Sequence, residues 1–172
     1  MHIKPSVLRG RPGFVLRPLS LLDSIALFEL IERSREHLSQ WGDTTSAKYP
    51  DLESVSRSII DPPNPAKWRF GIWNGKKFLG SINLTPTRPG EAEIGYWIGE
   101  RHTSNGYATE AVVILARWAF QTMGLKRLTA QVHIDNLGSQ KALGRARFNI
   151  EYECECGRYL HCEMPRPKSM GR

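Results

Sequence analysis

The sequence predicts an α/β domain in which a mixed sheet is flanked by helices. Stretches with strand patterning alternate with longer stretches that carry apolar residues at helical spacing, in the order β-αα-β-β-β-α-β-α-β-β. Asn74-Gly75 separates two of the strand stretches, and this dipeptide is a strong hairpin signal. The 172 residues suffice for one core, and a content of 40% hydrophobic and 24% charged residues is typical of a globular protein.

The first strand and the first helix are indicated by a proline and a capping pattern. Residues 14–17 favour a strand that stops at Pro18. Ser20 and Asp23, three residues apart, resemble a capping box. Apolar residues at helical spacing follow, so we expect a helix that runs to about Leu38.

Prolines and turn residues delimit the elements that follow. Asp51 is placed to open a second helix, which ends before Pro62 and Pro63. Residues 69–73 and 77–82 then form the two strands of the hairpin. The remaining elements are a strand at 93–98, a helix from 106 to about 123 capped by Gly124, a strand at 126–133, a helix at 137–147 and two strands around Gly157.

The charge distribution divides the chain into a domain and two basic ends. The net charge is +7, and the basic residues cluster only near the termini. We therefore assign residues 1–12 to a basic lead-in, 13–164 to a single domain and 165–172 to a basic tail. No helix-turn-helix, zinc-finger or RNA-binding aromatic motif is present in the sequence, and the scattered charge predicts no direct readout of nucleic acid.

Hydropathy and cysteine usage predict a cytoplasmic protein. No apolar run approaches the roughly 20 residues that span a bilayer, so we expect no membrane partner. The N-terminus lacks the apolar stretch of a signal peptide. Cys154, Cys156 and Cys162 fit neither a disulfide framework nor a zinc site, which favours three reduced thiols and no metal. Whether one of these thiols lies close to a bound cofactor stays open.

The most informative segment is residues 91–111, which predict a strand, a short polar loop and a helix that opens at Gly106. The first backbone N–H groups of a helix have no partner within it, and the helix dipole adds partial positive charge there. Gly106 and Ala108 are small, so an anion can approach the backbone closely. The segment therefore predicts a ligand that carries phosphate.

Four motifs in the same order resemble those of the GNAT superfamily of acetyl-CoA-dependent N-acetyltransferases. They are AEIGYWI, GYATEA, a helix ending in MGLKRL, and HIDNLGS. Within the superfamily the chain is most similar to the RimJ/RimL type, the acetyltransferases of ribosomal-protein N-termini, and the element from Leu38 to Trp41 supports this type. The resemblance covers about residues 13–164. It implies a mostly antiparallel sheet that splays between its fourth and fifth strands.

Three positions depart from the family pattern. Thr103 stands where the phosphate loop usually has Gln or Arg, and Arg147 precedes Phe148 where glycine is usual. Arg158 stands about where the ribosomal-protein enzymes often carry an acidic residue. We expect acetyl-CoA binding in spite of Thr103, because in the family backbone amides hold the phosphates. The later changes bear on the choice of substrate.

The resemblance implies which residues bind acetyl-CoA. Trp97 and Ile98, on the strand beside the splay, would pair with pantetheine, and Asn136 would bond the pantetheine arm. For Trp97 a place in the core is an equal alternative. The pyrophosphate would be bound by the loop residues Ser104, Asn105, Gly106, Tyr107, Ala108 and Thr109.

Two residues are candidates for catalysis. Glu93 shares one strand face with Gly95 and Trp97, and as a base it would take the amine proton through a water. Its alternative is a structural ion pair. Ser139 would protonate the leaving thiolate, and its alternative is a helix cap. His133 is a second choice as base, and a structural role is its alternative.

The acceptor is an amine of one of two classes. We expect a peptide or protein N-terminus, with a small amine such as an antibiotic, amino acid or polyamine as the alternative, and a non-catalytic acyl-CoA-binding module as a third reading. Trp41 is the candidate substrate residue, although core and interface roles stay open. Glu151, Glu153 and Glu155 share one strand face, which suits either a cationic substrate or a solvated edge. A homodimer also stays open.

Overall fold

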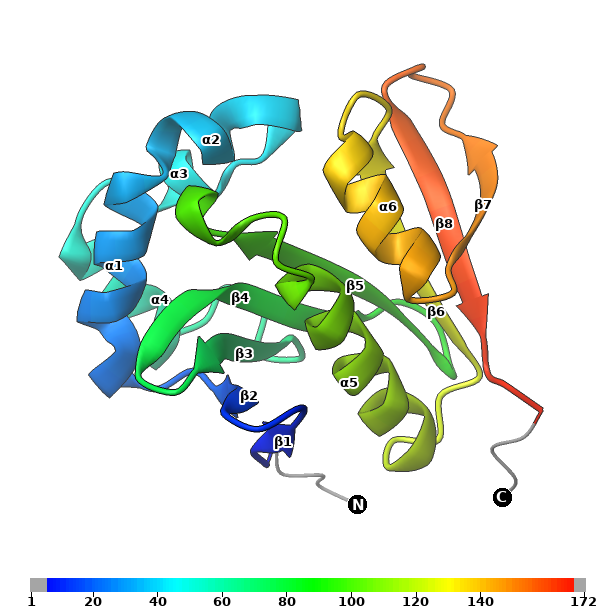
Figure 1. The fold of residues 1–172 in the computed structure, drawn as a ribbon, viewed down its shortest axis with the longest axis horizontal. Helices are drawn as coiled ribbons and strands as arrows, with labels where there is room; N and C mark the ends of the chain where they lie inside the picture. Colours follow the sequence, from blue (N-terminus) through cyan, green and yellow to red (C-terminus); the bar gives the residue numbers. More distant parts are fainter. Residues whose placement is uncertain (1–5, 169–172) are drawn as a thin grey trace.

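A computed structural model describes residues 6–168 of the chain (Figure 1). Its eight-stranded sheet has the order β1-β2-β3-β4-β5-β6-β8-β7, and every neighbouring pair is antiparallel except β5 and β6. The strands are β1 (Leu8–Arg9), β2 (Phe14–Pro18), β3 (Trp68–Asn74), β4 (Lys77–Pro86), β5 (Glu91–Ile98), β6 (Arg127–His133), β7 (Asn149–Glu153) and β8 (Tyr159–Pro165).

Six α-helices and three 3₁₀ turns connect these strands within the described residues. The helices are α1 (Ser24–Arg33), α2 (Arg35–Ser39), α3 (Thr45–Lys48), α4 (Leu52–Ile60), α5 (Tyr107–Gln121) and α6 (Leu137–Arg145). The 3₁₀ turns are η1 (Leu21–Asp23), η2 (Gln40–Gly42) and η3 (Glu100–His102). The predicted mixed, mostly antiparallel sheet flanked by helices is confirmed.

The predicted splay is also confirmed, between β5 and β6. These two strands pair at only three positions, and the last pair is Glu93 with Thr129. Beyond it β5 continues to Ile98 and β6 to His133 without facing each other. The two are the fourth and fifth strands of the prediction, because the short strand β1 was assigned to the lead-in and shifts the numbering by one.

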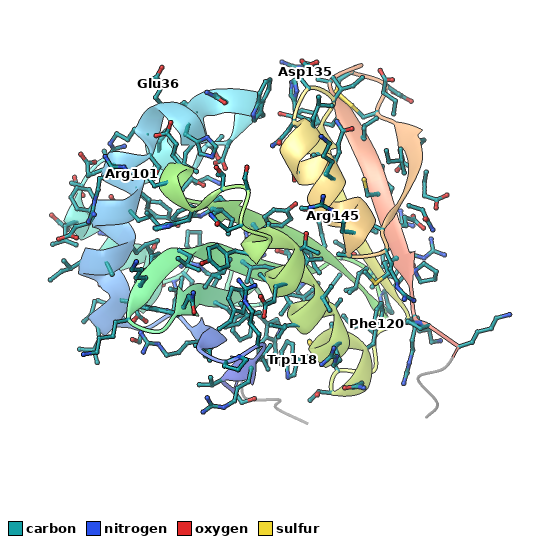
Figure 2. The ribbon with its side chains drawn as sticks, viewed as in Figure 1. Glu36, Arg101, Trp118, Phe120, Asp135 and Arg145 are labelled. Carbon is teal, nitrogen blue, oxygen red and sulfur yellow. A yellow bond between two sulfur atoms is a disulfide. The ribbon has the colours of Figure 1, made fainter. Side chains whose placement is uncertain are left out.

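Helices cover the sheet on both faces. α5 lies across one face (Figure 1), where its Trp118 packs edge-on against Trp68 at 5.3 Å and Phe70 at 5.7 Å between ring centroids (Figure 2). A second, smaller core forms where α1, α2 and α4 pack against β4 and β5. Its buried members are Leu27, Leu30, Ile31, Leu38, Val55 and Phe78.

The predicted first helix is interrupted at Ser34. This residue has the non-helical angles φ −124° and ψ 13°, and it separates α1 from α2. Its buried hydroxyl oxygen accepts a hydrogen bond from the backbone N–H of Glu100, 3.2 Å away. The helical arm therefore turns where it meets the end of β5, a long-range contact that local periodicity does not record.

The predicted capping signals are found close to where the sequence placed them. Ser20 and Asp23 form a capping box, which opens η1 just before α1. Asp51 caps α4 by accepting a hydrogen bond from the backbone N–H of Ser54. α5 ends two residues earlier than expected, at Gln121, and Gly124 follows with a φ of 69°.

The cysteines differ from the prediction of three reduced thiols. Cys154 and Cys156 are joined by a disulfide in the turn between β7 and β8, and Cys162 is free and buried in β8. Among residues 6–168, no three His, Cys, Asp or Glu side chains are grouped so that they could hold a metal ion. No helix in the same range is long and apolar enough to cross a bilayer.

Candidate active site

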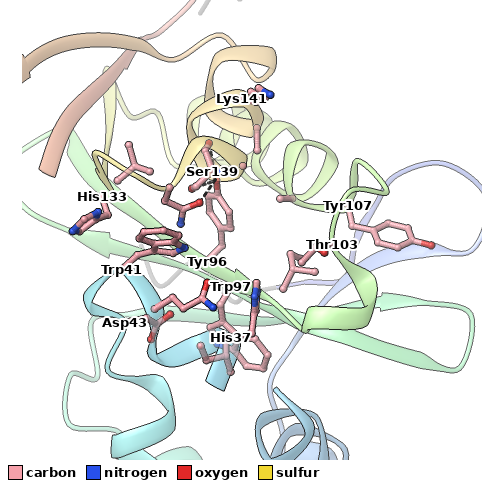
Figure 3. A pocket seen from close by; sticks show the side chains of 18 of the residues that line it. His37, Trp41, Asp43, Tyr96, Trp97, Thr103, Tyr107, His133, Ser139 and Lys141 are labelled. Atoms are coloured by element: carbon pink, nitrogen blue, oxygen red, sulfur yellow. Dashed lines mark hydrogen bonds between the residues drawn. The ribbon is translucent and has the colours of Figure 1, made fainter. Parts of the chain in front are cut away.

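A cavity of about 660 Å³ opens where β5 and β6 diverge (Figure 3). Its walls come from the N-terminal end of α5, from α6, from the free part of β5, from the end of β6 and the start of β8, and from α2 and η2. Of the predicted site residues, those that line it are Trp41, Trp97, Ile98, Ser104, Gly106, Tyr107, Ala108, Thr109, Asn136 and Ser139. Glu93 and Asn105 are not among its lining residues.

One end of the cavity is the loop before α5. Gly106 is the N-cap of this 15-residue helix and has a φ of 75°, and Ser104 is also left-handed with a φ of 63°. Such alternation of backbone conformation points successive N–H groups toward a common concavity, which is an anion-binding geometry. The side chain of Asn105 stays out of the cavity and instead braces the loop, donating to the carbonyl oxygens of Thr103 at 2.8 Å and His102 at 3.3 Å.

The side chain of Tyr107 also turns away from the cavity (Figure 3). Its ring stacks on Phe14 at 5.9 Å, and its hydroxyl oxygen accepts a hydrogen bond from Asn74 Nδ2 at 3.3 Å. Tyr107 therefore anchors the start of α5 to β2 and β3, and its backbone N–H is the part that is placed for an anion.

Two cations on α6 flank this end of the cavity. Lys141 and Arg145 both line it, and they are four residues apart, so they lie on one face of the helix. Figure 2 shows Arg145 on the part of α6 that lies next to α5. Sequence reasoning missed both residues, although their spacing on a helix that follows the phosphate loop was available as a signal.

The middle of the cavity is the unpaired edge of β5. From Ile94 to Ile98 the edge that would face β6 has no strand partner. The side chain of Trp97 packs with Phe78, 6.5 Å away, beside the smaller core. The alternative of a packed side chain thus holds for Trp97, and because its backbone borders the cavity, its pairing with pantetheine stays a prediction.

Ser139 lies opposite this edge, in the first turn of α6. Its hydroxyl oxygen is 2.6 Å from that of Tyr96, and Tyr96 is contributed by β5 (Figure 3). The N-cap of α6 is Asn136, whose side-chain oxygen accepts from the backbone N–H of Ser139 at 3.0 Å. The cap of α6 is therefore Asn136, and the hydroxyl group of Ser139 is engaged with Tyr96 instead. Burial raises the pKa of Tyr96 to about 12, and the hydrogen bond to Ser139 opposes that rise.

The other end of the cavity is aromatic. Trp41 leaves 40% of its surface exposed and lies 5.6 Å from the ring of His133, which lies 5.3 Å from the ring of Tyr159. A Cβ on Gly42 would lie 2.1 Å from the Tyr159 hydroxyl oxygen, so any larger residue there would have to displace the Tyr159 side chain. The α2–η2 arm and the β6–β8 pair thereby meet across the splay, and Asp43 lines the cavity beside them.

Comparison with known proteins identifies the family. Residues 14–149 match the family described as the acetyltransferase (GNAT) domain. The chain belongs to the GNAT acetyltransferase family. It is 36% identical over 150 residues to the N-acetyltransferase YjdG of Bacillus subtilis (strain 168), which covers 78% of this chain and 87% of that one.

Two solved structures share the fold of this GNAT acetyltransferase. The ribosomal-protein-S5-alanine acetyltransferase from Vibrio fischeri has a TM-score of 0.84 at 18% identity, covering 95% of this chain and 98% of that one. RimL, a ribosomal L7/L12 α-N-protein acetyltransferase in complex with coenzyme A, has a TM-score of 0.82 at 16% identity, covering 93% and 98%. The resemblance to the RimJ/RimL type is thus confirmed at the level of fold.

In this GNAT acetyltransferase Glu93 lies at the point where the splay begins. It is the last residue of β5 that pairs with β6, and alternation places its side chain opposite that of Ile94, which packs under α5. The carboxylate therefore lies on the sheet face away from α5, outside the cavity wall. Lys67 is close enough for Glu93 to favour its charged form, although burial lowers the pKa of Lys67 overall.

His133 lines the cavity but is oriented as a hydrogen-bond donor. Its Nδ1 accepts from the backbone N–H of Asp135 at 3.2 Å, so the neutral ring carries its proton on Nε2. The acidic row lies elsewhere: Glu151 and Glu153 are exposed on β7, the outermost strand of the sheet, and Glu155 is exposed in the turn that follows. None of the three lines the cavity.

Proposed function

We propose that this acetyltransferase transfers the acetyl group of acetyl-CoA to the α-amino group of a peptide or protein N-terminus. The observation that carries the proposal is the continuity of one cavity, which joins the amide loop at 104–109 to the Ser139 hydroxyl and to the aromatic end at Trp41. The order of these groups matches the order in which the reaction needs them: phosphate binding, leaving thiolate, acceptor.

Acetyl-CoA fits the chemistry of the cavity along its length. The backbone amides before α5 and the cations Lys141 and Arg145 favour the pyrophosphate. The unpaired edge of β5 offers backbone donors and acceptors to the amide groups of pantetheine. Asn136 lines the same stretch, and its amide nitrogen is available for the pantetheine arm while its oxygen caps α6.

The reaction needs a neutral amine that attacks the thioester carbonyl, and a proton for the thiolate that leaves. Ser139 is placed for the second task, because its hydroxyl group faces the cavity next to the free edge of β5. For the first task, an α-amino group has a pKa of about 7.7–8.0 against about 10.4 for lysine, so it needs less help from a base at neutral pH. Glu93, whose side chain lies on the sheet face away from α5, stays our candidate for that base. It would take the amine proton through a water molecule.

The acceptor end supports a peptide N-terminus. Trp41, His133 and Tyr159 form an apolar wall with hydrogen-bonding edges, and the carboxylate of Asp43 beside it favours an ammonium group. The two solved neighbours are named as acetyltransferases of ribosomal proteins, and these names agree with a peptide or protein N-terminus as the acceptor. An acceptor that is a small amine would use the same wall and the same carboxylate.

A two-step experiment tests the proposal. First, thermal unfolding of the wild-type protein is followed with increasing acetyl-CoA, because a ligand of the native state raises the melting temperature. Second, thiol release is followed with a panel of N-terminal peptides, the same peptides with acetylated N-termini, and small amines. We expect stabilisation and thiol release with free N-terminal peptides alone.

Each other outcome has a distinct meaning. No thermal shift at saturating acetyl-CoA would refute the cofactor. A thermal shift without thiol release by any acceptor would indicate a binding module. Turnover of small amines, with none of any peptide, would move the conclusion to the small-molecule class.

A further inference from the structure

We infer that Tyr96 is a positioning residue for acetyl transfer, which orients the Ser139 hydroxyl group so that its proton points at the sulfur of the leaving thiolate. The inference rests on the proposed function, since it concerns the breakdown of a thioester in the same cavity. It gives a role to Tyr96, a residue to which the family resemblance assigned none.

The position of Tyr96 follows from the splay. It lies three residues beyond the last pair of β5 with β6, so its side chain extends into the gap that the diverging strands leave. Its hydroxyl oxygen reaches α6, where it is 2.6 Å from Ser139 Oγ and 3.3 Å from the Ser139 carbonyl oxygen. Its ring is held by packing against the main core.

In the 2.6 Å contact either hydroxyl group could be the donor, and our inference assigns that role to Tyr96. Tyr96 has a single proton, and of its two contacts on Ser139 the one with Oγ is shorter than the one with the carbonyl oxygen at 3.3 Å. When Tyr96 donates to Ser139 Oγ, the serine proton is free to point elsewhere. The cavity lies on that side, because both residues line it.

Tyr96 stays a donor at every working pH. Burial raises its pKa to about 12, so the phenol remains protonated where an acetyltransferase is assayed. A hydroxyl group that accepts one hydrogen bond is polarised and donates a stronger one. The Tyr96 contact therefore both aims the Ser139 proton and strengthens its hydrogen bond.

The step balances in atoms and protons. The amine nitrogen bonds to the thioester carbonyl carbon, the C–S bond breaks, and its electron pair leaves on sulfur. The nitrogen loses one proton to water, the sulfur takes the proton of Ser139, and Ser139 recovers a proton from water, so acetyl-CoA and a primary amine give an amide and a free thiol. Tyr96 keeps its own proton and acts only through Ser139.

The test compares Tyr96→Phe, Ser139→Ala and the double variant with a matched control, Tyr49→Phe. The control also removes one tyrosine hydroxyl group, which accepts a hydrogen bond from Arg69 Nη2 at 3.2 Å and does not line the cavity. For each protein kcat, the KM of the acceptor and the dissociation constant of acetyl-CoA are measured, together with the melting temperature.

We expect Tyr96→Phe to lower kcat about fivefold to tenfold, the size of one lost hydrogen bond, with acetyl-CoA affinity unchanged. Ser139→Ala should lower kcat further, and the double variant should equal Ser139→Ala, because Tyr96 acts only through that hydroxyl group. Tyr49→Phe should keep the wild-type kcat.

Two results would overturn the inference. One is a kcat for Tyr96→Phe equal to that of Tyr49→Phe. The other is a double variant whose loss is the product of the two single losses, which would mean independent structural effects. A wild-type protein that binds acetyl-CoA and releases no thiol would instead refute the proposed function, and this inference with it.

Discussion

Replacing Gly106 by alanine should separate the folding role of the phosphate loop from its binding role. Gly106 has a φ of 75°, a conformation that costs an L-residue roughly 1–2 kcal/mol. In a chain of this length each kcal/mol lowers the melting temperature by about 2–4 °C. A Cβ at Gly106 meets no protein atom within 4 Å, and because the residue lines the cavity, we expect the added methyl group to obstruct a phosphate bound there.

Gly124 provides the matched control. It has a φ of 69°, a Cβ there would also meet nothing within 4 Å, and it lies beyond the opposite end of α5, outside the cavity lining. Gly124→Ala and Gly106→Ala should therefore lose similar stability without ligand. With acetyl-CoA at 100 times its dissociation constant, the wild type and Gly124→Ala should gain about 2.7 kcal/mol.

Gly106→Ala should gain much less from the same ligand concentration. A hundredfold loss of affinity would reduce the gain to about 0.4 kcal/mol, which is a thermal shift of roughly 1–2 °C. The assay is thermal unfolding of the three proteins across a titration of acetyl-CoA. An equal ligand-induced shift in the two variants would refute the assignment of this loop to the pyrophosphate.

Three further substitutions test the acceptor side and the base. Gly42→Ala should raise the acceptor KM, because its Cβ would displace Tyr159. Gly75→Ala, with a φ of 58° and no atom within 4 Å of its Cβ, is the control for backbone strain. Equal kinetics in the two variants would contradict a role of the contact between Gly42 and Tyr159 in acceptor binding. Trp41→Ala should raise the acceptor KM while acetyl-CoA affinity is unchanged, and a large drop in melting temperature would instead indicate a structural role. Glu93→Gln should lower turnover, most visibly at lower pH, without changing acetyl-CoA affinity. A wild-type pH–rate profile in that variant would exclude Glu93 as the base.

The parts of the fold that could be predicted are those specified by local chemistry. The hairpin at Asn74-Gly75, the cap at Asp51 and the helix start at Gly106 each depend on residues within one turn of each other. The break at Ser34 could not be predicted, because it depends on a hydrogen bond to Glu100 far along the chain. The disulfide was missed because two cysteines separated by one residue are an uncommon pair.

The candidate site divides in the same way. The loop at 104–109, which we propose as the cofactor end, is one continuous segment that the sequence motif predicted, whereas Lys141 and Arg145 beside it were missed. The partnership of Tyr96 with Ser139 crosses the splay between residues 43 positions apart, so neither strand nor helix periodicity indicates it. The contact of Gly42 with Tyr159 spans a still longer stretch of sequence. At the aromatic end of the cavity the sequence analysis named Trp41 and, as a second-choice base, His133, but not Tyr159.

The splay between β5 and β6 links the free energy of cofactor binding to the placement of the reacting thioester. Backbone N–H and C=O groups need hydrogen-bond partners, and a strand edge inside a domain normally finds them on its neighbour. The edge of β5 from Ile94 to Ile98 lacks that neighbour because β6 diverges after Glu93. If the missing partner is the pantetheine arm, occupation of the cavity completes the sheet, and the thioester is set beside Ser139 by the same contacts that hold the cofactor. Binding and orientation of the donor are then one event, while the acceptor end, built from the α2–η2 arm and the β6–β8 pair, is free to differ among relatives that share this fold.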